Sequence, residues 1–250
     1  MNDDSNFSSS KRKYLSSKLA ANFQLGNHLF ELVSIVGIAR VLHRTPVFFI
    51  ENAEYMKDLE ETNETFPGVI DQFLIFNGRV PWNIEETVFH PRCCIYEDPR
   101  VLLHITDDHI HLSGTLYQSY KYFDGMRTEI LGWLRKPKRQ YFGLPVSDKT
   151  THITCVHTRR GDFLAAGFQA SDSHFIREAV KYIEKKASHS TFGWWLGYVS
   201  KYNKVYYMDM RVHYVGALSF GDINIHDYYP PNWTPLKFST DNRTIVVGDN

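Results

Sequence analysis

The chain has 250 residues, of which 43% are hydrophobic and 15% aromatic, so it can bury a substantial core and is not disordered as a whole. Its 28 Lys and Arg residues balance 28 Asp and Glu residues, which excludes a broad positive field for nucleic acid or a membrane surface and confines any anion site to a local cluster. Three cysteines exclude a disulfide scaffold and a zinc ribbon, and no run of about 18 apolar residues predicts a membrane-spanning helix.

The first half of the chain predicts a strand–helix–strand unit. A short strand is expected at residues 14–19, and apolar residues at helical spacing predict a mostly buried helix at residues 27–42. An apolar, β-rich run follows at residues 45–50, and this order is that of a βαβ unit. Residues 101–112 then predict a strand and a turn, and residues 125–134 a helix that ends before a proline.

The second half of the chain repeats the alternation. Residues 136–149 contain two prolines and a glycine and are the best candidate for a linker. Residues 151–157 predict a buried strand, and residues 172–186 predict a helix. We therefore predict an α/β protein of two halves.

The sharpest chemical signal is the segment HTRRGDF at residues 157–163, which follows the predicted strand directly. Ligands bind beyond the carboxyl ends of strands in open α/β sheets, and a planar guanidinium from Arg159 or Arg160 matches two phosphate oxygens of a diphosphate. Gly161 permits a tight turn, and Asp162 can cap the following amides or hold an arginine. The alternative is a surface loop with an Arg–Asp ion pair.

Two further segments can contribute to an anion site. SHSTFGWW at residues 188–195 places hydroxyls ahead of an apolar helix, where they can donate to phosphate oxygens; the alternative is a plain helix cap with the tryptophans in the core. Gly26 and Asn27 precede the first long helix and by themselves indicate only a turn from loop to helix.

Other chemical signatures fail. The chain has no Walker loop, no GxGxxG, no GxSxG elbow and no Asp-x-Asp pair of the kind that holds a metal against a nucleotide-sugar diphosphate. One group of His and Asp side chains suggests a metal, but its mixed spacing on a strand and turn predicts different faces and a solvated turn. That group consists of His104, Asp107, Asp108, His109 and His111.

Five segments in order resemble the α-1,2-fucosyltransferases, glycosyltransferase family 11. HTRRGDF at 157–163 resembles the family's HxRRGDY/F motif, and LGNHLF at 25–30 resembles its LGNQxF segment. GTLYQSYKYF at 114–123 resembles GYFQSxKYF, and SHSTFGWW at 188–195 resembles SNSTFSWW. YPPNWT at 229–234 is similar to the terminal YPxxW.

The resemblance implies a GT-B-like fold of two Rossmann-type halves and an inverting transferase that needs no metal and no cofactor. Its co-substrate would be GDP-fucose, and its acceptor the 2-hydroxyl of a galactose-type glycan or glycoprotein. No nucleic acid is expected as a partner, and no membrane contact is visible in this chain. The family also implies residence in the Golgi lumen through an N-terminal membrane anchor.

The resemblance also implies roles for particular residues. Arg159 and Arg160 would stabilise the departing GDP diphosphate in place of a metal, with Asp162 orienting their loop. Ser190 and Thr191 would donate hydrogen bonds to the phosphates.

On the opposing domain, Gly26 and Asn27 would bind GDP-fucose at the cleft where fucose meets the acceptor. The group that removes the acceptor proton is left open between His157 and Asp162.

The sequence departs from the family in three places, one of which is the absence of an anchor before residue 14. His28 replaces the usual Gln, and the helix that follows the arginine motif runs almost directly from residue 186 into Ala187, with one or two βαβ units missing. We therefore expect an incomplete C-terminal half, and we interpret the chain as a shortened form, such as a splice product or an incorrect gene model.

The expected domains follow from these boundaries. An N-terminal acceptor-side domain covers residues 14–140, and a C-terminal donor-side domain covers residues 150–236. Residues 1–13 and 237–250 are expected to be flexible tails.

Two alternatives for function and location stay open. The chain is either an active fucosyltransferase or a catalytically inactive GDP- or glycan-binding relative, or else a truncated product without function. No anchor precedes residue 14 in this sequence, although N-x-[ST] triplets favour the secretory pathway, with Asn63 and Asn232 as glycosylation candidates.

Overall fold

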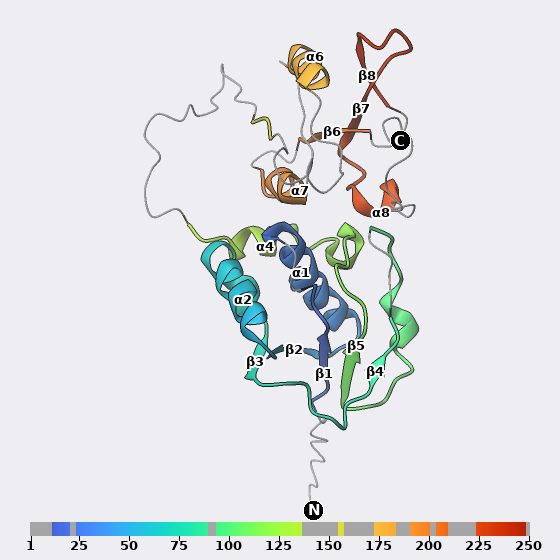
Figure 1. The fold of residues 1–250 in the computed structure, drawn as a ribbon. Coiled ribbons are helices and arrows are strands. Elements are labelled where there is room, and N and C mark those ends of the chain that lie inside the picture. The colour runs from blue at the N-terminus through green and yellow to red at the C-terminus, as the bar shows by residue number, and fades with distance from the viewer. Residues whose placement is uncertain are drawn as a thin grey trace, which may run out of the picture.

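The computed structural model describes residues 12–20, 24–89, 94–136, 155–157, 173–183, 191–200, 204–209 and 224–248 (Figure 1).

A wholly parallel sheet of five strands forms the base of the first half, in the order β3-β2-β1-β5-β4. Its strands are β1 (Tyr14–Ser17), β2 (Thr45–Ile50), β3 (Leu74–Asn77), β4 (Glu86–Thr87) and β5 (His109–Leu112). Strands β1 and β2 pair in parallel, and a helix connects them in the chain, so the predicted βαβ unit is confirmed. The predicted α/β class is confirmed with it.

Helix α1 (Leu25–Val41) lies at the centre of this half. Thirteen of its 17 residues are buried, because its apolar side chains extend around the whole helix rather than along one stripe. Gly37 lets the 3₁₀-helix η2 (Tyr120–Phe123) approach closely, since a β-carbon there would lie 1.9 Å from the carbonyl oxygen of Tyr122.

The remaining helices of this half surround α1. In Figure 1, α2 lies beside α1 on the same side of the sheet, and α4 lies at the opposite end of these helices from the strands. These elements are α2 (Ala53–Thr65), α3 (Pro67–Ile70), the 3₁₀-helix η1 (Pro99–Leu102) and α4 (Arg127–Trp133). The helix predicted at residues 125–134 is therefore confirmed with slightly shorter ends.

The two faces of the sheet differ in character. Leu15, Phe48 and Ile110 point to the helices and join the main core. His109 and His111 lie on the opposite face of β5, and both ring nitrogens are 2.8 Å from Ser16 Oγ. The expectation of a solvated turn with side chains on different faces is therefore wrong for these two histidines, because residues two apart on a strand share a face.

A second, smaller sheet contains β6 (Tyr206–Met208), β7 (Thr234–Phe238) and β8 (Ile245–Val247). β6 pairs with β7 in parallel, and β7 with β8 antiparallel. Helix α6 (Ser173–Ile183) packs on this sheet through Phe175 and Ala179, while α7 (Thr191–Tyr198) and α8 (Ile225–Tyr228) lie toward α1 (Figure 1).

The end of the chain differs from the expected flexible tail. Residues 237–248 complete β7 and form β8, and Ile245 is buried beside Leu236 in the second core. The resemblance ends at about residue 236, within β7, but the alternating apolar side chains of the hairpin give it a packed face of its own.

The strand predicted at residues 151–157 is wrong where the structure describes it. Residues 155–157 belong to no strand, and Val156 is 41% exposed. An apolar, β-branched run forms a strand only where a neighbouring strand offers its backbone groups, and within the described residues none pairs with this segment.

Other expectations fall only partly within the structure. Helix α6 confirms residues 173–183 of the predicted helix at 172–186. The linker predicted at residues 136–149 lies, apart from Lys136, outside the described residues. Among the described helices, none is both long and apolar enough to cross a membrane.

Candidate functional site

The candidate site gathers around the loops that leave β1 and β5. The two strands are parallel neighbours, with their last residues, Ser17 and Leu112, in register. Their carboxyl ends therefore lie together at the edge of the sheet where open α/β folds bind ligands. Helix α1 begins at Leu25, after the first of these loops.

Three side chains from separate segments meet at the start of α1. The Nε2 of Gln118 donates a hydrogen bond of 2.7 Å to Asn27 Oδ1. The thiol of Cys94 donates to Gln118 Oε1 at 3.4 Å. Cys94 and Gln118 are buried and Asn27 is half-buried. The three hydrogen-bonded side chains therefore lead, in this order, from the interior toward the surface.

The turn before Gln118 is held in an unusual backbone conformation. Leu116 and Tyr117 have φ angles of 69° and 40°, a region that non-glycine residues rarely adopt. Leu116 N donates to Glu31 Oε1 at 2.7 Å, and Ser34 Oγ donates to the carbonyl oxygen of Tyr117 at 2.9 Å. Both partners are buried residues of α1, so this helix sets the shape of the turn.

A buried charged cluster lies on the same part of α1. His28 Nε2 is 3.4 Å from Asp58 Oδ1 of α2, and His28 Nδ1 is 3.6 Å from Glu31 Oε2. Glu31 is fully buried, and its other oxygen, Oε1, also accepts the backbone N–H of Ala20 at 3.0 Å. Burial raises the pKa of Asp58, and the nearby His28 opposes that shift.

Helix α7 packs residues 191–195, the TFGWW part of the SHSTFGWW segment, against α1. Trp194 and Trp195 are buried in an aromatic cluster with Phe30 and Phe123, so the interpretation of the tryptophans as core residues is confirmed. Trp195 Nε1 donates to the carbonyl oxygen of Gly26 at 3.1 Å.

A second tryptophan contact joins α7 to the end of α8. Trp194 Nε1 donates to the carbonyl oxygen of Tyr228 at 3.0 Å, in the residue before the YPPNWT segment. Asp227, next to it, pairs through Oδ1 with Lys121 Nζ and accepts the backbone N–H of Tyr96 at 3.0 Å. Ser119 Oγ donates to the carbonyl oxygen of Asp227. The GTLYQSYKYF segment and α8 are thereby fixed to each other.

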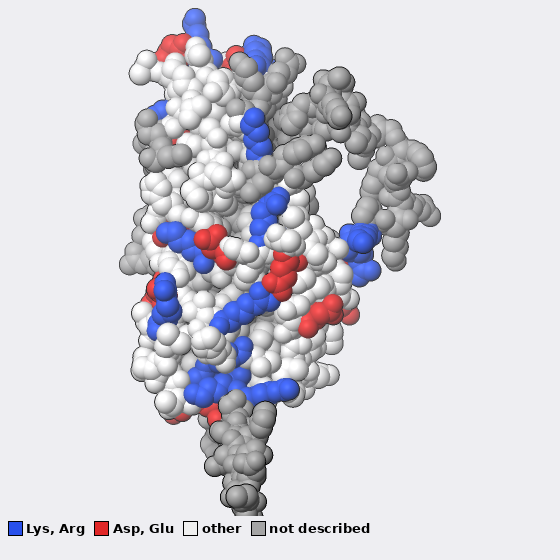
Figure 2. Space-filling model, turned by 180° about the vertical axis from the view of Figure 1, so that it is seen from behind, with Lys and Arg blue, Asp and Glu red and all other residues white. Residues whose placement is uncertain are grey.

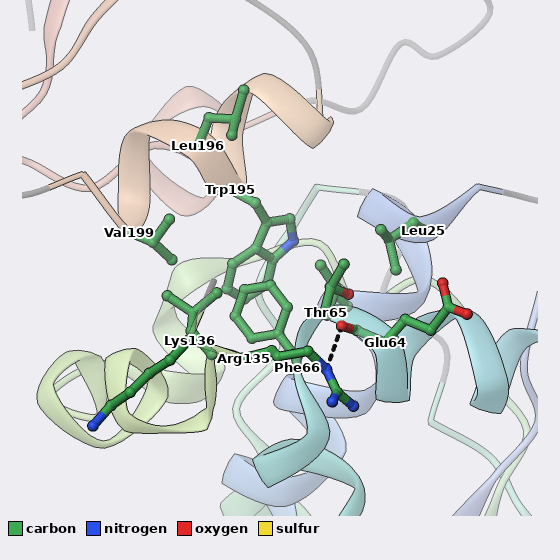
Figure 3. A pocket seen from close by; sticks show the side chains of 11 residues that line it. Leu25, Glu64, Thr65, Phe66, Arg135, Lys136, Trp195, Leu196 and Val199 are labelled. Carbon is green, nitrogen blue, oxygen red and sulfur yellow. Dashed lines mark hydrogen bonds between the residues drawn. The ribbon is translucent and has the colours of Figure 1, made fainter. Parts of the chain in front are cut away.

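A cavity of about 310 Å³ opens beside these contacts (Figure 3). Leu25 of α1, Phe66 and Trp195 form much of its apolar wall. Arg135 stands at its rim, but its guanidinium already donates to the carbonyl oxygens of Glu64 and Asn63 at 2.7 Å each. These bonds hold the guanidinium against the carbonyl groups at the C-terminal end of α2.

Charges on the surface are largely balanced locally. Figure 2 shows Lys and Arg side chains interspersed with Asp and Glu on one face of the molecule. The Arg40 guanidinium binds both carboxylate oxygens of Glu129 at 2.6 Å each, and this pairing lowers the pKa of Glu129. Within the described part of the chain, no group of three or more His, Cys, Asp and Glu residues is arranged to hold a metal ion.

The structure describes some of the predicted site residues. Gly26 is buried and Asn27 half-buried in the first turn of α1, Thr191 is the first residue of α7, and His157 is half-buried. Asn63 is exposed on α2, and Asn232 is exposed in a turn. Arg159, Arg160, Asp162 and Ser190 lie outside the described residues.

Sequence reasoning missed Gln118, Glu31 and Trp195 as residues that join the segments. Gln118 and Trp195 lie inside segments that carry the resemblance, which was the available signal. Glu31 could have been found as a single acid within an otherwise apolar helix, because a buried charge needs specific partners.

Several proteins of Caenorhabditis elegans are similar to this chain. "Putative galactoside 2-alpha-L-fucosyltransferase svh-11" is 38% identical over 94% of this chain and 82% of its own length. "Putative glycosyltransferase C06E1.7" is 28% identical over 94% and 83%, and a protein named "Galactoside 2-alpha-L-fucosyltransferase" is 26% identical over 85% and 74%. No family model and no solved structure matches the chain.

The first of these matches also carries information on length. It extends over 301 aligned positions, whereas this chain has 250 residues, so at least 51 positions of that relative have no counterpart here. Its identity and coverage, together with the other relatives named for the same activity, settle the family. The chain belongs to the galactoside 2-alpha-L-fucosyltransferase family of glycosyltransferases.

Proposed function

We propose that this chain is built to transfer fucose from GDP-fucose to the 2-hydroxyl of a galactose-type acceptor, with inversion and without a metal. The observation that carries the proposal is the convergence of the resembling segments. Gly26 and Asn27 bind Trp195 and Gln118, so three segments far apart in the sequence meet at the carboxyl edge of one sheet. Open α/β folds bind their ligands at this edge, so the meeting of the segments there supports a ligand site.

The proposed chemistry uses charge from side chains. As the bond between fucose and phosphate breaks, GDP gains negative charge, and Arg159 and Arg160 stabilise it more strongly than they stabilise the ground state. Ser190 and Thr191 donate to the phosphates at the start of α7, and Asp162 orients the arginine loop. Either His157 or Asp162 removes the acceptor proton.

The two halves of the reaction divide between two Rossmann-type domains in this proposal. The five-stranded parallel sheet, with Gly26 and Asn27 at its edge, supports an acceptor-side domain of the GT-B type. The smaller sheet of β6, β7 and β8 supports a donor-side domain that lacks its central strands. The length of the match to the first relative supports the same shortening, which we assign to residues 186 and 187.

Transfer can be measured directly. The 250-residue chain, and a version with the relative's additional residues inserted after residue 186, are incubated with GDP-fucose and a β-galactoside in EDTA. We expect a 2-fucosylated product from the restored chain at least. Lack of transfer by both, under conditions where the C. elegans relative transfers fucose, would contradict the proposal, as would transfer that requires Mn²⁺.

A second candidate function is supported by the shortening itself. A chain that lacks central strands of its donor-side sheet can retain a GDP or glycan site without turnover, or can be a truncated product without function. Calorimetry with GDP separates these possibilities: micromolar binding without transfer indicates a binding protein. A thermal transition that is cooperative but unaffected by GDP indicates a folded chain without a donor site.

The family resemblance favours a location in the secretory pathway, and we propose the Golgi lumen. Exposed sequons at Asn63 and Asn232 support this proposal, because oligosaccharyltransferase needs an accessible acceptor. A glycosidase-sensitive mass shift of the protein made in animal cells, lost in the Asn63→Gln, Asn232→Gln double variant, is the expected result. An unmodified mass would place the protein outside that compartment.

A further inference from the structure

The carboxamide of Asn27 has a defined polarity in this structure. Its Oδ1 accepts the hydrogen bond of 2.7 Å from Gln118 Nε2, so its NH₂ group points away from Gln118. Asn27 is half-buried in the first turn of α1, and no described residue accepts a hydrogen bond from its Nδ2. With respect to the described residues, this NH₂ group is therefore available as a donor at the carboxyl edge of the sheet.

Gln118 is itself oriented by a third residue. A thiol is a donor, and the thiol of Cys94 lies 3.4 Å from Gln118 Oε1. This contact fixes the oxygen end of the Gln118 carboxamide on Cys94 and leaves the NH₂ end for Asn27. Cys94 is 2% exposed and Gln118 is 5% exposed, so water does not compete for either group.

The backbone turn before Gln118 has φ angles that non-glycine residues rarely adopt. Two successive residues, Leu116 and Tyr117, occupy the left-handed region, and such conformations persist only where surrounding contacts enforce them. Glu31 accepts Leu116 N through a buried carboxylate, Ser34 binds the Tyr117 carbonyl, and Ser17 Oγ lies 2.7 Å from the Tyr117 hydroxyl. Strain of this kind is concentrated where a side chain has to be aimed.

We propose that Gln118 is a positioning residue, which orients the Asn27 carboxamide so that its NH₂ group donates a hydrogen bond to an oxygen of the nucleotide sugar. This inference rests on the proposed function for the identity of the ligand and extends it to a residue that does not itself touch the ligand. A neutral donor that is already oriented before binding suits a diphosphate or sugar oxygen, because the amide loses no rotational freedom when the ligand binds.

The orientation is tested first in the protein without ligand. In ¹⁵N-labelled protein, the side-chain NH₂ signals of Asn27 and Gln118 are assigned by their loss in Asn27→Asp and Gln118→Glu. We expect the Asn27 NH₂ protons to exchange rapidly with water and those of Gln118 to be protected. In Gln118→Glu the new carboxylate accepts instead of donating, so the Asn27 NH₂ should become protected. Protected Asn27 protons in the unsubstituted protein would overturn the proposal.

The second test is a double-mutant cycle on GDP affinity, with neutral substitutions. Gln118→Met keeps the side-chain length but removes the hydrogen bonds to Asn27 and Cys94, and we expect it to weaken GDP binding about tenfold. In the Asn27→Ala background the same change should have no further effect, because the two residues act through one contact. Losses that add in the double variant would overturn the proposal and make Gln118 a structural residue only.

A control separates this result from a general effect of losing an amide. Gln72 Nε2 donates to the carbonyl oxygen of Gly68 and makes none of the contacts at the start of α1 described above, so Gln72→Met should leave GDP affinity unchanged. If neither the 250-residue chain nor the version restored after residue 186 binds GDP, the ligand assignment fails together with the proposed function. The exchange experiment then still decides whether Gln118 orients Asn27.

Discussion

The indole Nε1 of Trp195 donates a hydrogen bond of 3.1 Å to the carbonyl oxygen of Gly26, a residue 169 positions earlier in the chain. Both groups are buried, and Gly26 lies in the first turn of α1. This contact attaches α7, and with it the segment that carries Thr191, to the helix that carries Asn27. The two segments proposed to contact the nucleotide sugar, through Thr191 and Asn27, are thus linked by one buried hydrogen bond.

Removing this bond should destabilise the protein. Trp195→Phe removes the buried indole donor to the Gly26 carbonyl oxygen and leaves a gap in the aromatic cluster, so we expect a loss of about 2–4 kcal/mol in the free energy of unfolding. Trp82 is 95% exposed and serves as the control, since Trp82→Phe should change stability by less than about 0.5 kcal/mol. Urea unfolding measures both, and equal losses would contradict the role of the bond.

A pair of glycine substitutions tests the close packing of α1 against η2. A β-carbon at Gly37 would overlap the carbonyl oxygen of Tyr122 at 1.9 Å, so Gly37→Ala should cost about 3 kcal/mol or more. A β-carbon at Gly132 in α4 would meet nothing within 4 Å, so Gly132→Ala should be neutral or stabilise by up to about 1 kcal/mol. Thermal unfolding of the two variants distinguishes them, and a harmless Gly37→Ala would show that the two elements separate.

The ion pair between Lys121 and Asp227 should contribute more than a surface pair. Asp227 is 5% exposed and also accepts the backbone N–H of Tyr96, so Asp227→Asn leaves a buried amide opposite a cation, at a cost of about 2–3 kcal/mol. The exposed pair of Asp98 and Arg100 provides the control, because Asp98→Asn should cost less than about 1 kcal/mol. Chemical denaturation measures the free energy of unfolding of both variants. A larger loss for Asp98→Asn than for Asp227→Asn would contradict this ranking.

His109 should make stability depend on pH. Burial, helped by His111 and Arg44, lowers the pKa of His109 to about 4, below its ordinary value near 6.5. Between these values the unfolded chain binds a proton that the folded chain does not, so stability is lost as the pH falls through this window, by on the order of 1–3 kcal/mol.

The variant His109→Asn removes this titration. The difference in unfolding free energy between pH 7 and pH 4.5 should therefore shrink, although the lowered pKa of His111 retains part of it. His43 is exposed with a φ of 52°, which Asn tolerates, so His43→Asn is the matched control and should keep the full difference.

Arg160 is the residue on which the proposed chemistry depends most. Arg160→Ala should reduce turnover roughly 10²–10³-fold, the usual loss for one preorganised contact to a developing charge. Arg160→Lys should be nearly as damaging, because it keeps the charge but loses the planar fork. Steady-state kinetics on an active form of the enzyme measure both, with folding checked separately. Near-normal turnover of Arg160→Lys would transfer the role to Arg159.

The sequence by itself determined the βαβ unit and the central helix. Their signals are local: the apolar, β-rich run over residues 45–50 and the apolar residues at helical spacing over α1 depend only on near neighbours. The order of the resembling segments is also a property of the sequence, and it sufficed for the family, which the relatives confirm.

Only the tertiary structure decided which of these segments touch. The pairing of Asn27 with Gln118 and of Gly26 with Trp195 depends on how α1, η2 and α7 pack, and no periodicity encodes it. The same holds for β8, whose strand exists because β7 offers it backbone groups, and for residues 155–157, which form no strand. A local pattern states what a segment can bury, whereas hydrogen bonds between segments far apart are fixed only when the whole core has closed around them.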